Sequence, residues 1–352
     1  MKIIFNAKYL DVFIKNSKSL KYDKATKKYD NIIIKVANNT TLFIKSNLEE
    51  EIVQAFGCEI IEEGVVCIPS NVFNLLDTKS KFDEFITIED NLITTDSKTI
   101  EIKEDIEPLP FLYDKFTPDY NIFTDLSDKK IKELLEVTHA LGSNSVRSIL
   151  ECINIKDNKF AALDGFRLSV REGDFKSEKE VLFKHYNTLA SMKGNITATA
   201  NDKIIRFSNN QFNYYTYLTD GEGIEYEKLF TKNKRIDITI QNIEKLKDGL
   251  NKVKSLVKEK NNHVIQLNIS KDYIYLNAKN YKVTFEEKFL CTHHVKCEED
   301  LKICFNVNYL IDSLKYMDKE SHLCFTSEVN PIDIINGNKY ELLLPVRVKE
   351  YA

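Results

Sequence analysis

The chain reads FNAKYLDVFIK at residues 5–15 and FNVNYLIDSLK at residues 305–315. Each copy has an extended apolar lead-in, an asparagine, and then apolar residues at helical spacing, as at Leu10 and Phe13 in the first copy. Asparagine is favoured at a helix N-cap, because its side chain accepts a hydrogen bond from a first-turn backbone N–H that has no helical partner. Both copies therefore predict a strand that runs into a helix, and their likeness indicates duplication of one structural unit.

The same junction recurs at four further places. They are VVCIPSNVFNLLDTK at 65–79, TDLSDKKIKELLEVTHAL at 124–141, EVLFKHYNTLASMK at 180–193 and IDITIQNIEKLKDGLNKVKSLVK at 236–258. The six helices are expected to start near residues 6, 69, 127, 184, 241 and 306, which is a repeat of about sixty residues. Between them lie short β-rich runs separated by polar turns such as Asn-Asn and Glu-Asp-Asn. Each unit thus predicts a strand, a helix and about three antiparallel strands.

One such unit cannot cover both its helix and the face of its sheet, so the units are expected to pair into domains. We predict an α+β protein of three similar domains, each a pair of strand-helix-antiparallel-strand units. The first seam falls at residues 105–120, which hold three of the six prolines, and the second falls near residues 221–235. The predicted domains are an N-terminal domain at 1–117, a central domain at 118–232 and a C-terminal domain at 233–352.

The composition predicts a soluble cytoplasmic protein. A chain of 352 residues with 43% hydrophobic residues can bury substantial cores. No stretch approaches the roughly 18 uncharged apolar residues that a membrane span needs, and Asp11 interrupts the apolar start of the chain. Seven scattered cysteines with no C-x-x-C pair are typical of free thiols in a reducing compartment.

The charge is unevenly distributed along the chain. The whole chain has a net charge of −4, yet the six windows of the expected helices hold 19 lysines and 10 acidic residues, a net charge of +9. The remainder therefore carries −13. A basic set of helices on an acidic protein indicates one surface that faces phosphate, although lysine-rich helix faces can also be merely solvated. The repeat favours the first interpretation, because equivalent helices of equivalent units tend to line one side of an assembly.

Three stretches resemble the bacterial DNA polymerase III beta subunit, the DNA sliding clamp family. They are VRSILECINIKDNKFAALDGFRLSV at 146–170, FNVNYLIDSLKYMDKESHLCFTSEVNPIDI at 305–334 and YELLLPVRV at 340–348. The resemblance implies the DNA clamp fold and a head-to-tail homodimer that forms a pseudo-six-fold ring. Its helices would line a hole that encircles double-stranded DNA without sequence preference. It further implies a nucleoid-associated processivity factor that has no cofactor and no membrane partner.

In this family, a hydrophobic pocket takes short linear peptides from DNA polymerase, the clamp loader and repair proteins. Carried over to this sequence, the resemblance implies the following peptide-binding residues: Leu150, Leu163, Gly165, Arg167, Leu168, Ile224, Lys228, Leu229, Asn306, Tyr309, Val329, Leu344, Pro345, Val346 and Arg347. The candidates to face DNA are Lys8, Lys15, Lys18, Lys79, Lys81, Lys132, Arg147, Lys184, Lys193, Lys247, Lys252, Lys254 and Lys315. The dimer interface would include Ile100, Ile102, Leu256 and Val257.

The sequence departs from the family pattern at three places. Leu163 stands where the family often has a small polar residue, Ile224 stands where it often has proline, and KEYA follows Val348 at the end of the chain. The pocket is therefore expected to prefer a different peptide, and the tail to cover part of it.

Two other function classes are weighed against a clamp. A metal site could use Cys291, His293, His294 and Cys297 in CTHHVKC, but a strand would point alternate side chains to opposite faces. A protein-binding scaffold would keep the pocket but would give the helix lysines no reason to share a face. No G-x-S-x-G, Walker loop or H-E-x-x-H appears, so no catalytic residue is expected. Asp164 is interpreted as the start of a turn.

Overall fold

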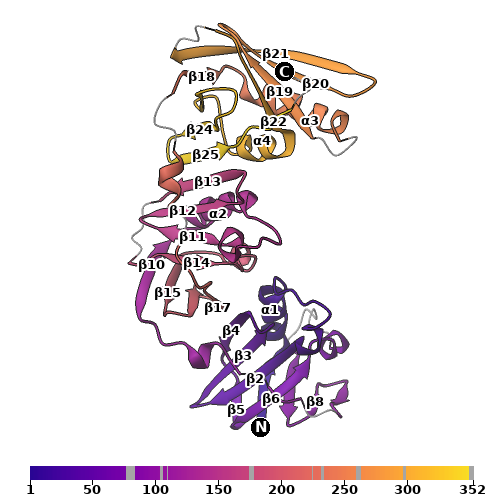
Figure 1. The fold of residues 1–352 in the computed structure, drawn as a ribbon. Helices are drawn as coiled ribbons and strands as arrows, with labels where there is room; N and C mark the ends of the chain where they lie inside the picture. Colours follow the sequence, from indigo (N-terminus) through magenta and orange to yellow (C-terminus); the bar gives the residue numbers. More distant parts are fainter. Residues whose placement is uncertain are drawn as a thin grey trace. The chain divides into compact units, whose positions relative to one another are not determined.

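The computed structural model describes residues 1–76, 84–103, 106–108, 110–173, 178–223, 225–230, 234–258, 263–295 and 299–348 (Figure 1). The chain divides into two compact units. The first comprises Met1–Lys132 and Phe175–Asp220, and the second comprises Glu133–Asp174 and Gly221–Ala352. The boundaries of the three predicted domains stay a prediction.

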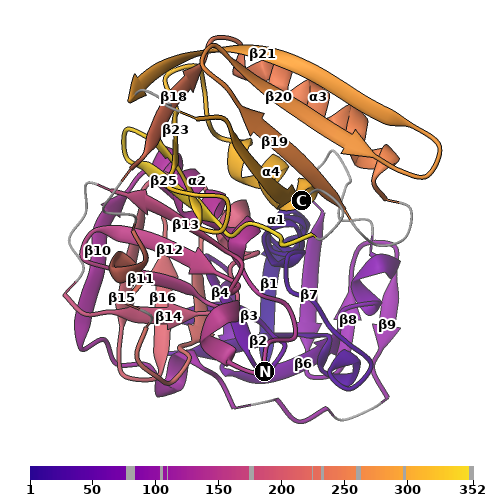
Figure 2. The same ribbon diagram turned by 45° about the horizontal axis from the view of Figure 1, so that its top comes forward.

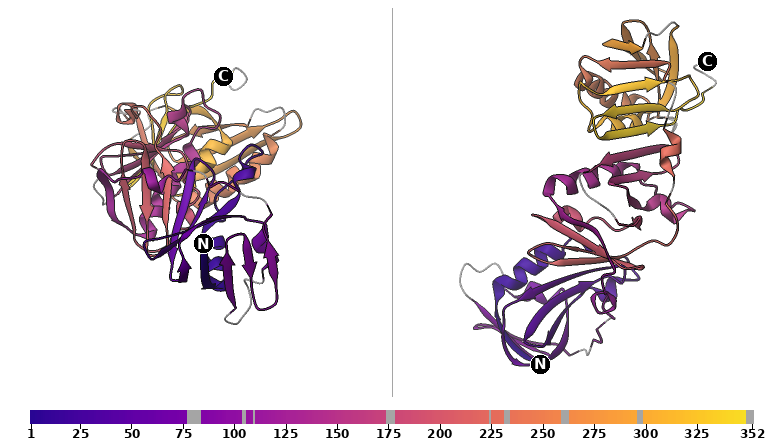
Figure 3. Two further views of the ribbon diagram at one scale, coloured as in Figure 1. Left: turned by 90° about the horizontal axis from the view of Figure 1, so that it is seen from below. Right: turned by 90° about the vertical axis from the view of Figure 1, so that its left-hand side faces the viewer.

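The first unit contains two antiparallel sheets. Its strands are β1 (Lys2–Asn6), β2 (Asn31–Ala37), β3 (Thr40–Ser46), β4 (Glu50–Phe56), β5 (Glu59–Glu62), β6 (Gly64–Pro69), β7 (Phe85–Glu89), β8 (Leu92–Thr94), β9 (Thr99–Glu101), β10 (Tyr120–Leu126), β14 (Val181–Phe183), β15 (Ile196–Ala200), β16 (Ile204–Ser208) and β17 (Asn213–Tyr217). One sheet has the order β5-β1-β7-β8-β9, and the other has the order β10-β15-β16-β17-β4-β3-β2-β6. Helix α1 (Ala7–Ser17) packs against β1 and β4 (Figure 3).

The second unit is built on one run of neighbouring strands. They are β11 (Ile153–Lys156), β12 (Lys159–Leu163), β13 (Arg167–Glu172), β18 (Ile236–Ile240), β19 (Val264–Ile269), β20 (Tyr273–Lys279), β21 (Thr284–Val295), β22 (Leu301–Asn306), β23 (His322–Phe325), β24 (Ile332–Asn336) and β25 (Lys339–Leu343). Their order in the sheet is β11-β12-β13-β25-β24-β23-β18-β21-β20-β19-β22. The α-helices of this unit are α3 (Ile243–Leu256) and α4 (Val307–Leu314), and α2 (Asp128–Glu136) ends in it.

Short 3-10 helices connect these elements. They are η1 (Lys27–Tyr29), η2 (Val72–Leu75), η3 (Tyr113–Lys115), η4 (Val137–Ala140), η5 (Ser148–Glu151), η6 (Leu189–Ser191) and η7 (Tyr226–Leu229). None of the helices among the described residues is both long and apolar enough to cross a membrane.

The repeated phrase forms the two junctions that the sequence predicts. In the first copy Asn6 ends β1 and accepts a hydrogen bond of 3.0 Å from the backbone N–H of Lys8. In the second copy Asn306 ends β22 and accepts one of 2.9 Å from the N–H of Asn308. Asn242 caps α3 in the same way. The prediction of strands that run into capped helices is therefore confirmed at both ends of the chain.

Two of the six expected helices are wrong as predicted. The segment after residue 69 forms only η2 among its described residues, because Pro69 closes strand β6 and does not open a helix. The segment after residue 184 forms only η6. There Thr188 is fully buried and contacts the Ser19 hydroxyl at 2.9 Å, so a long-range contact fixes the backbone where a helix would have to continue.

Asparagine-rich turns close the hairpins. Asn38 and Asn39 have φ values of 51° and 58° between β2 and β3. Asp157 and Asn158 have φ values of 47° and 64° between β11 and β12. Two successive positive φ values make the type I′ turn that matches the twist of a β-hairpin, and asparagine tolerates that backbone better than most residues.

A large core of the second unit lies between its sheet and its helices. Leu246, Leu250 and Val253 of α3 are buried against β20 and β21 (Figure 2). Gly249 lets the helix lie this close, since an added Cβ would come within 3.2 Å of the Phe289 ring. Leu310 and Leu314 of α4 join the same core. The observed architecture confirms the α+β class.

Candidate functional site

A tight turn at the end of β12 shapes one side of the candidate peptide site. The Asp164 carboxylate oxygen Oδ1 accepts hydrogen bonds from the backbone N–H groups of Phe166 (2.9 Å) and Arg167 (3.0 Å). Gly165 has a φ of 88°, which glycine adopts without strain. The turn leaves the Phe166 side chain 58% exposed. The interpretation of Asp164 as a turn residue is therefore confirmed.

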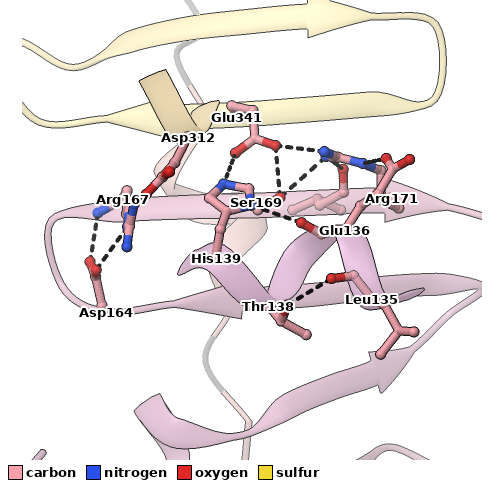
Figure 4. Close-up of polar contacts among 11 residues, drawn as sticks. Leu135, Glu136, Thr138, His139, Asp164, Arg167, Ser169, Arg171, Asp312 and Glu341 are labelled. Carbon is pink, nitrogen blue, oxygen red and sulfur yellow. Dashed lines mark hydrogen bonds and ion pairs between the residues drawn. The ribbon is translucent and has the colours of Figure 1, made fainter. Parts of the chain in front are cut away.

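Arg167 connects this turn to helix α4. Its Nε donates to Asp164 Oδ2 at 3.0 Å, and its Nη1 donates to Asp312 Oδ2 at 2.7 Å (Figure 4). Its guanidinium carbon also lies 4.3 Å from the centre of the Tyr309 ring. Such charge-assisted and cation–π contacts hold a planar guanidinium in one orientation. Arg167 thus fixes the distance between the turn and α4.

The structure brings three residues with apolar side chains together near Arg167. The Phe166 and Tyr309 rings lie 6.1 Å apart, and the Leu344 N–H donates a hydrogen bond of 2.9 Å to the Phe166 carbonyl oxygen. Leu344 is 37% exposed. We call Phe166, Tyr309 and Leu344 the aromatic patch. Exposed aromatic and aliphatic groups held by a rigid scaffold can anchor a partner.

The C-terminal segment continues from Leu344 to the end of β22, and the KEYA tail at 349–352 lies outside the described residues. Residues 344–348 follow β25, and the Val346 N–H donates a hydrogen bond of 2.8 Å to the Cys304 carbonyl oxygen at the end of β22. Pro345 is half-buried and Arg347 is exposed. Val329 is also exposed, in the loop before β24.

The other predicted pocket residues have varied environments. Leu168 is buried, and Leu163 packs against the same small apolar cluster. Leu150 is half-buried, whereas Leu229 is 47% exposed at the end of η7. Lys228 is ion-paired with Glu225. Ile224 lies outside the described residues.

A buried polar network connects β13 and β25 with α2 and η4. The Glu341 carboxylate accepts hydrogen bonds from Arg171 Nη2 (2.7 Å) and the Ser169 hydroxyl (2.8 Å), and its second oxygen lies 3.1 Å from His139 Nε2 (Figure 4). The Nε of Arg171 donates to Glu136 Oε2 at 2.9 Å. Arg171 and Glu341 are both fully buried. We call Glu136, His139, Ser169, Arg171 and Glu341 the buried network.

The predicted DNA-facing residues are mostly exposed. Lys8 and Lys15 share the exposed face of α1, and Lys15 pairs with Asp11 at 2.5 Å. Lys252 lies on the ridge of α3 opposite its buried face. Lys247 differs, since its amine binds Glu244 and the Met317 carbonyl oxygen and its side chain is only 17% exposed.

The remaining DNA-facing predictions divide into two groups. Exposed residues are Lys18, Lys132, Arg147, Lys184, Lys193, Lys254 and Lys315. Outside the described residues are Lys79 and Lys81. Most of the described candidates are therefore accessible to DNA, and Lys247 is the exception among them.

The four predicted dimer residues differ in exposure. Ile102 and Val257 are buried in the cores of their own units, at 7% and 3% exposure. Ile100, in the edge strand β9, is half-buried, and Leu256 packs only partly against its own core. Only Ile100 and Leu256 thus offer surface to a partner.

The Cys-His cluster is spread over both faces of β21. His293 Nε2 lies 2.9 Å from the Ser270 carbonyl oxygen and 3.7 Å from Cys291 Sγ. His294 instead contacts the Thr239 hydroxyl at 3.2 Å, and its ring lies 4.7 Å from the His322 ring at a tilt of 40°. Cys297 lies outside the described residues, and no group of three or more metal-ligating side chains converges among the described ones.

Sequence reasoning missed Phe166, Asp312 and the buried network. Phe166 could have been found, because an apolar side chain in a D-G-x-R turn has no core to enter. Arg171 and Glu341 lie 170 residues apart. A charged residue inside each apolar strand was the only signal of their pairing.

Comparisons with known proteins point to one kind of relative. Residues 227–344 match the family model for the DNA polymerase III beta subunit, C-terminal domain. The beta sliding clamp of Staphylococcus aureus (strain N315) is 26% identical over 241 residues, and the match spans 63% of this chain and 63% of that relative's length. The beta sliding clamp of Staphylococcus epidermidis is 24% identical over 346 residues, which are 90% of this chain and 89% of that relative.

Solved structures show the same fold. A DNA polymerase III beta subunit from Eubacterium rectale has a TM-score of 0.84 and 20% identity, and the match covers 98% of this chain and 99% of that one. The DNA polymerase sliding clamp from Bacillus subtilis has a TM-score of 0.84 and 18% identity over 99% of both chains. The chain therefore has the sliding-clamp fold. The family model, the relatives and the solved structures all carry the name of DNA polymerase III beta subunits or beta sliding clamps, and the chain is similar to these proteins.

Proposed function

We propose that this chain is a replicative sliding clamp. It encircles duplex DNA and tethers the DNA polymerase for processive synthesis, with no chemistry of its own. The observation that carries this proposal is that the likeness to beta sliding clamps runs along the chain, over 90% of it for the Staphylococcus epidermidis relative and 98% for the Eubacterium rectale structure. A scaffold that only binds protein would not need this whole architecture.

The ring is a head-to-tail homodimer in this proposal, and it acts in the cytoplasm at the nucleoid. Exposed lysines on α1 and α3 support contact with DNA. Lysine binds phosphate as a flexible point charge and does not read base edges from that position. Contacts of this kind hold DNA without favouring any sequence, which a protein that must slide requires.

The aromatic patch is the proposed binding site for short peptides of polymerase, clamp loader and repair proteins. Arg167 holds Phe166 and Tyr309 in place before a partner arrives, because two carboxylates and one ring fix its guanidinium. A site that is ordered in advance loses less conformational entropy on binding. Phe166 adds an exposed aromatic ring to the site, so the preferred peptide should carry apolar side chains that can pack against it.

The mass of the protein in solution tests the ring directly. One chain has a mass of 40.9 kDa, so light scattering should give about 82 kDa for the homodimer at micromolar concentration, because a closed interface of standard size gives a stable complex. A mass of one chain across that range would contradict a self-closing ring.

A further inference from the structure

Three residues of the buried network lie on β13 and β25, the strand pair whose ends are flanked by Phe166 and Leu344 of the aromatic patch. β13 pairs with β25 in a register that sets Arg167 opposite Leu343, Ser169 opposite Glu341 and Arg171 opposite Lys339. Leu343 leads directly into Leu344 of the patch, and Arg167 holds the patch from the other strand. Any change in this register would therefore move Phe166, which precedes β13, past Leu344, which follows β25.

The apolar face of this strand pair cannot fix the register alone. Leu168, Val170 and Leu342 pack there with Tyr226 and Ala161. Apolar packing is not directional, and a slip of two residues would keep apolar side chains on this face. The register must therefore be set by contacts that depend on position.

The opposite face supplies such contacts. Arg171 and Glu341 are fully buried, and Glu341 receives its donors from β13 and from His139 beside it. After a two-residue slip, Glu341 would lie opposite Arg167 or Arg171 instead of Ser169. It would also move away from His139 of η4. A buried carboxylate that loses hydrogen bonds is destabilised, so this face favours the observed register, in which Glu341 contacts Arg171, Ser169 and His139 at once.

His139 extends the network to η4. Its Nδ1 lies 2.7 Å from the Glu136 carbonyl oxygen, and its Nε2 lies 3.1 Å from the Glu341 carboxylate. Glu136 also accepts from Arg171, and Lys339 lies 3.2 Å from the Glu136 carboxylate. The network thus joins β13 to β25 and also joins both strands to α2 and η4.

We propose that the buried network is a register lock, which means that it fixes the register of β13 against β25. It thereby positions Phe166 relative to Leu344 in the aromatic patch. Arg171 and Glu341 act as positioning residues, since neither belongs to the patch. This inference rests on the proposed function of the patch as a peptide site. The lock makes the peptide affinity depend on side chains that the peptide does not touch.

Two variants separate positioning from stability. Glu341→Gln keeps the size of the side chain and removes its charge. The double variant Arg171→Met with Glu341→Leu replaces the ion pair by apolar side chains of similar length, a change that often preserves stability in buried pairs. The probe is a labelled peptide from the organism's replicative polymerase, measured by fluorescence polarisation, with thermal unfolding recorded in parallel.

We expect Glu341→Gln to weaken peptide binding by about three- to thirty-fold, the range found for residues that couple to a site without touching it. Exchange of the Leu344 amide hydrogen should also become faster, because its bond to Phe166 depends on the register. The double variant should regain the thermal stability of the wild type and still bind the peptide weakly. Wild-type affinity in a stable double variant would show that the pair only stabilises the fold, and the inference would be wrong.

Two controls keep the outcome decisive. If the double variant does not fold, Ser169→Ala takes its place, since it removes one donor from Glu341 and leaves the patch untouched; unchanged peptide affinity in it overturns the lock. Phe166→Ala tests the patch itself. Failure of the wild type to bind any peptide would reject the proposed function, whereas binding that depends on Phe166 but not on Glu341 would reject only the lock.

Discussion

At the residue scale, Arg167 shows how one side chain can organise a binding surface. It contacts a carboxylate in its own turn, a carboxylate on α4 and the Tyr309 ring. The sequence predicts the turn at Asp164, because aspartate followed by glycine is favoured in tight turns. It does not predict Asp312 as a partner, because that contact spans 145 residues and depends on where α4 lies.

Replacing Phe166 by alanine tests the patch at a single residue. Phe166 is 58% exposed, so its removal should leave the free energy of unfolding almost unchanged. Binding of the polymerase peptide should weaken by about 2 kcal/mol, as for an aromatic anchor. Tyr281→Ala is the matched control, since Tyr281 is a 66% exposed aromatic residue outside the patch. Equal affinities of the two variants would remove Phe166 from the site.

Glu51 predicts a pH dependence of stability in the first unit. Its buried carboxylate accepts hydrogen bonds of 3.0 Å from the N–H groups of Leu112 and Tyr113. Burial raises the pKa of Glu51 to about 7, although the two N–H groups oppose the shift. A raised pKa means that the folded state favours the protonated carboxyl, so its contribution is present below the unfolded pKa and is lost as pH rises through 7.

The Glu51→Gln variant carries no titrating group at this position. Its melting temperature should therefore rise relative to the wild type as pH increases from about 5 to about 7, and the difference should then level off. Thermal unfolding of both proteins across this range measures the effect. A difference that does not change with pH would show that Glu51 stays ionised in the fold.

At the scale of elements, the helices that formed as predicted are those whose signals are local. Asn6, Asn242 and Asn306 all cap helices, and each cap is followed by apolar residues on one face. The segments after residues 69 and 184 have similar apolar spacing but form only η2 and η6. A tertiary contact at Thr188 and the end of a strand at Pro69 outweighed helical spacing there.

The edge strand β9 and the end of α3 are the elements expected to close the ring. Replacing Ile100 and Leu256 together by lysine should give a folded monomer, because charges cannot be buried unpaired in an interface. Leu256 packs partly against its own core, so the circular dichroism spectrum must confirm the fold. Light scattering then reports the mass. A double variant that remains dimeric at micromolar concentration would place the interface elsewhere.

At the scale of the whole molecule, the pattern of the sequence is enough to predict the class of fold. The repeat of strand, helix and antiparallel strands predicts an α+β architecture, and the structure confirms it. The two compact units of the structure include Glu133–Asp174 with the C-terminal part of the chain. Composition along the chain cannot predict such a grouping, because it depends on the pairing of β13 with β25.

We propose that the protein holds DNA by encircling it. A ring needs only weak phosphate contacts, and strong contacts would raise the barrier to sliding. Affinity for short linear duplex should therefore be poor and should fall further as salt releases the bound counterions. Retention on a closed circle should depend on salt far less, because escape then requires the ring to open.

The most direct measurement loads the protein onto a closed circular duplex with a clamp loader and then cuts the circle with a nuclease. The labelled protein should stay on the intact circle through gel filtration and should leave after the cut by sliding off the ends. If it instead bound short linear DNA tightly and remained on the cut circle, the exposed lysines would form an ordinary DNA-binding face, and encirclement would be contradicted.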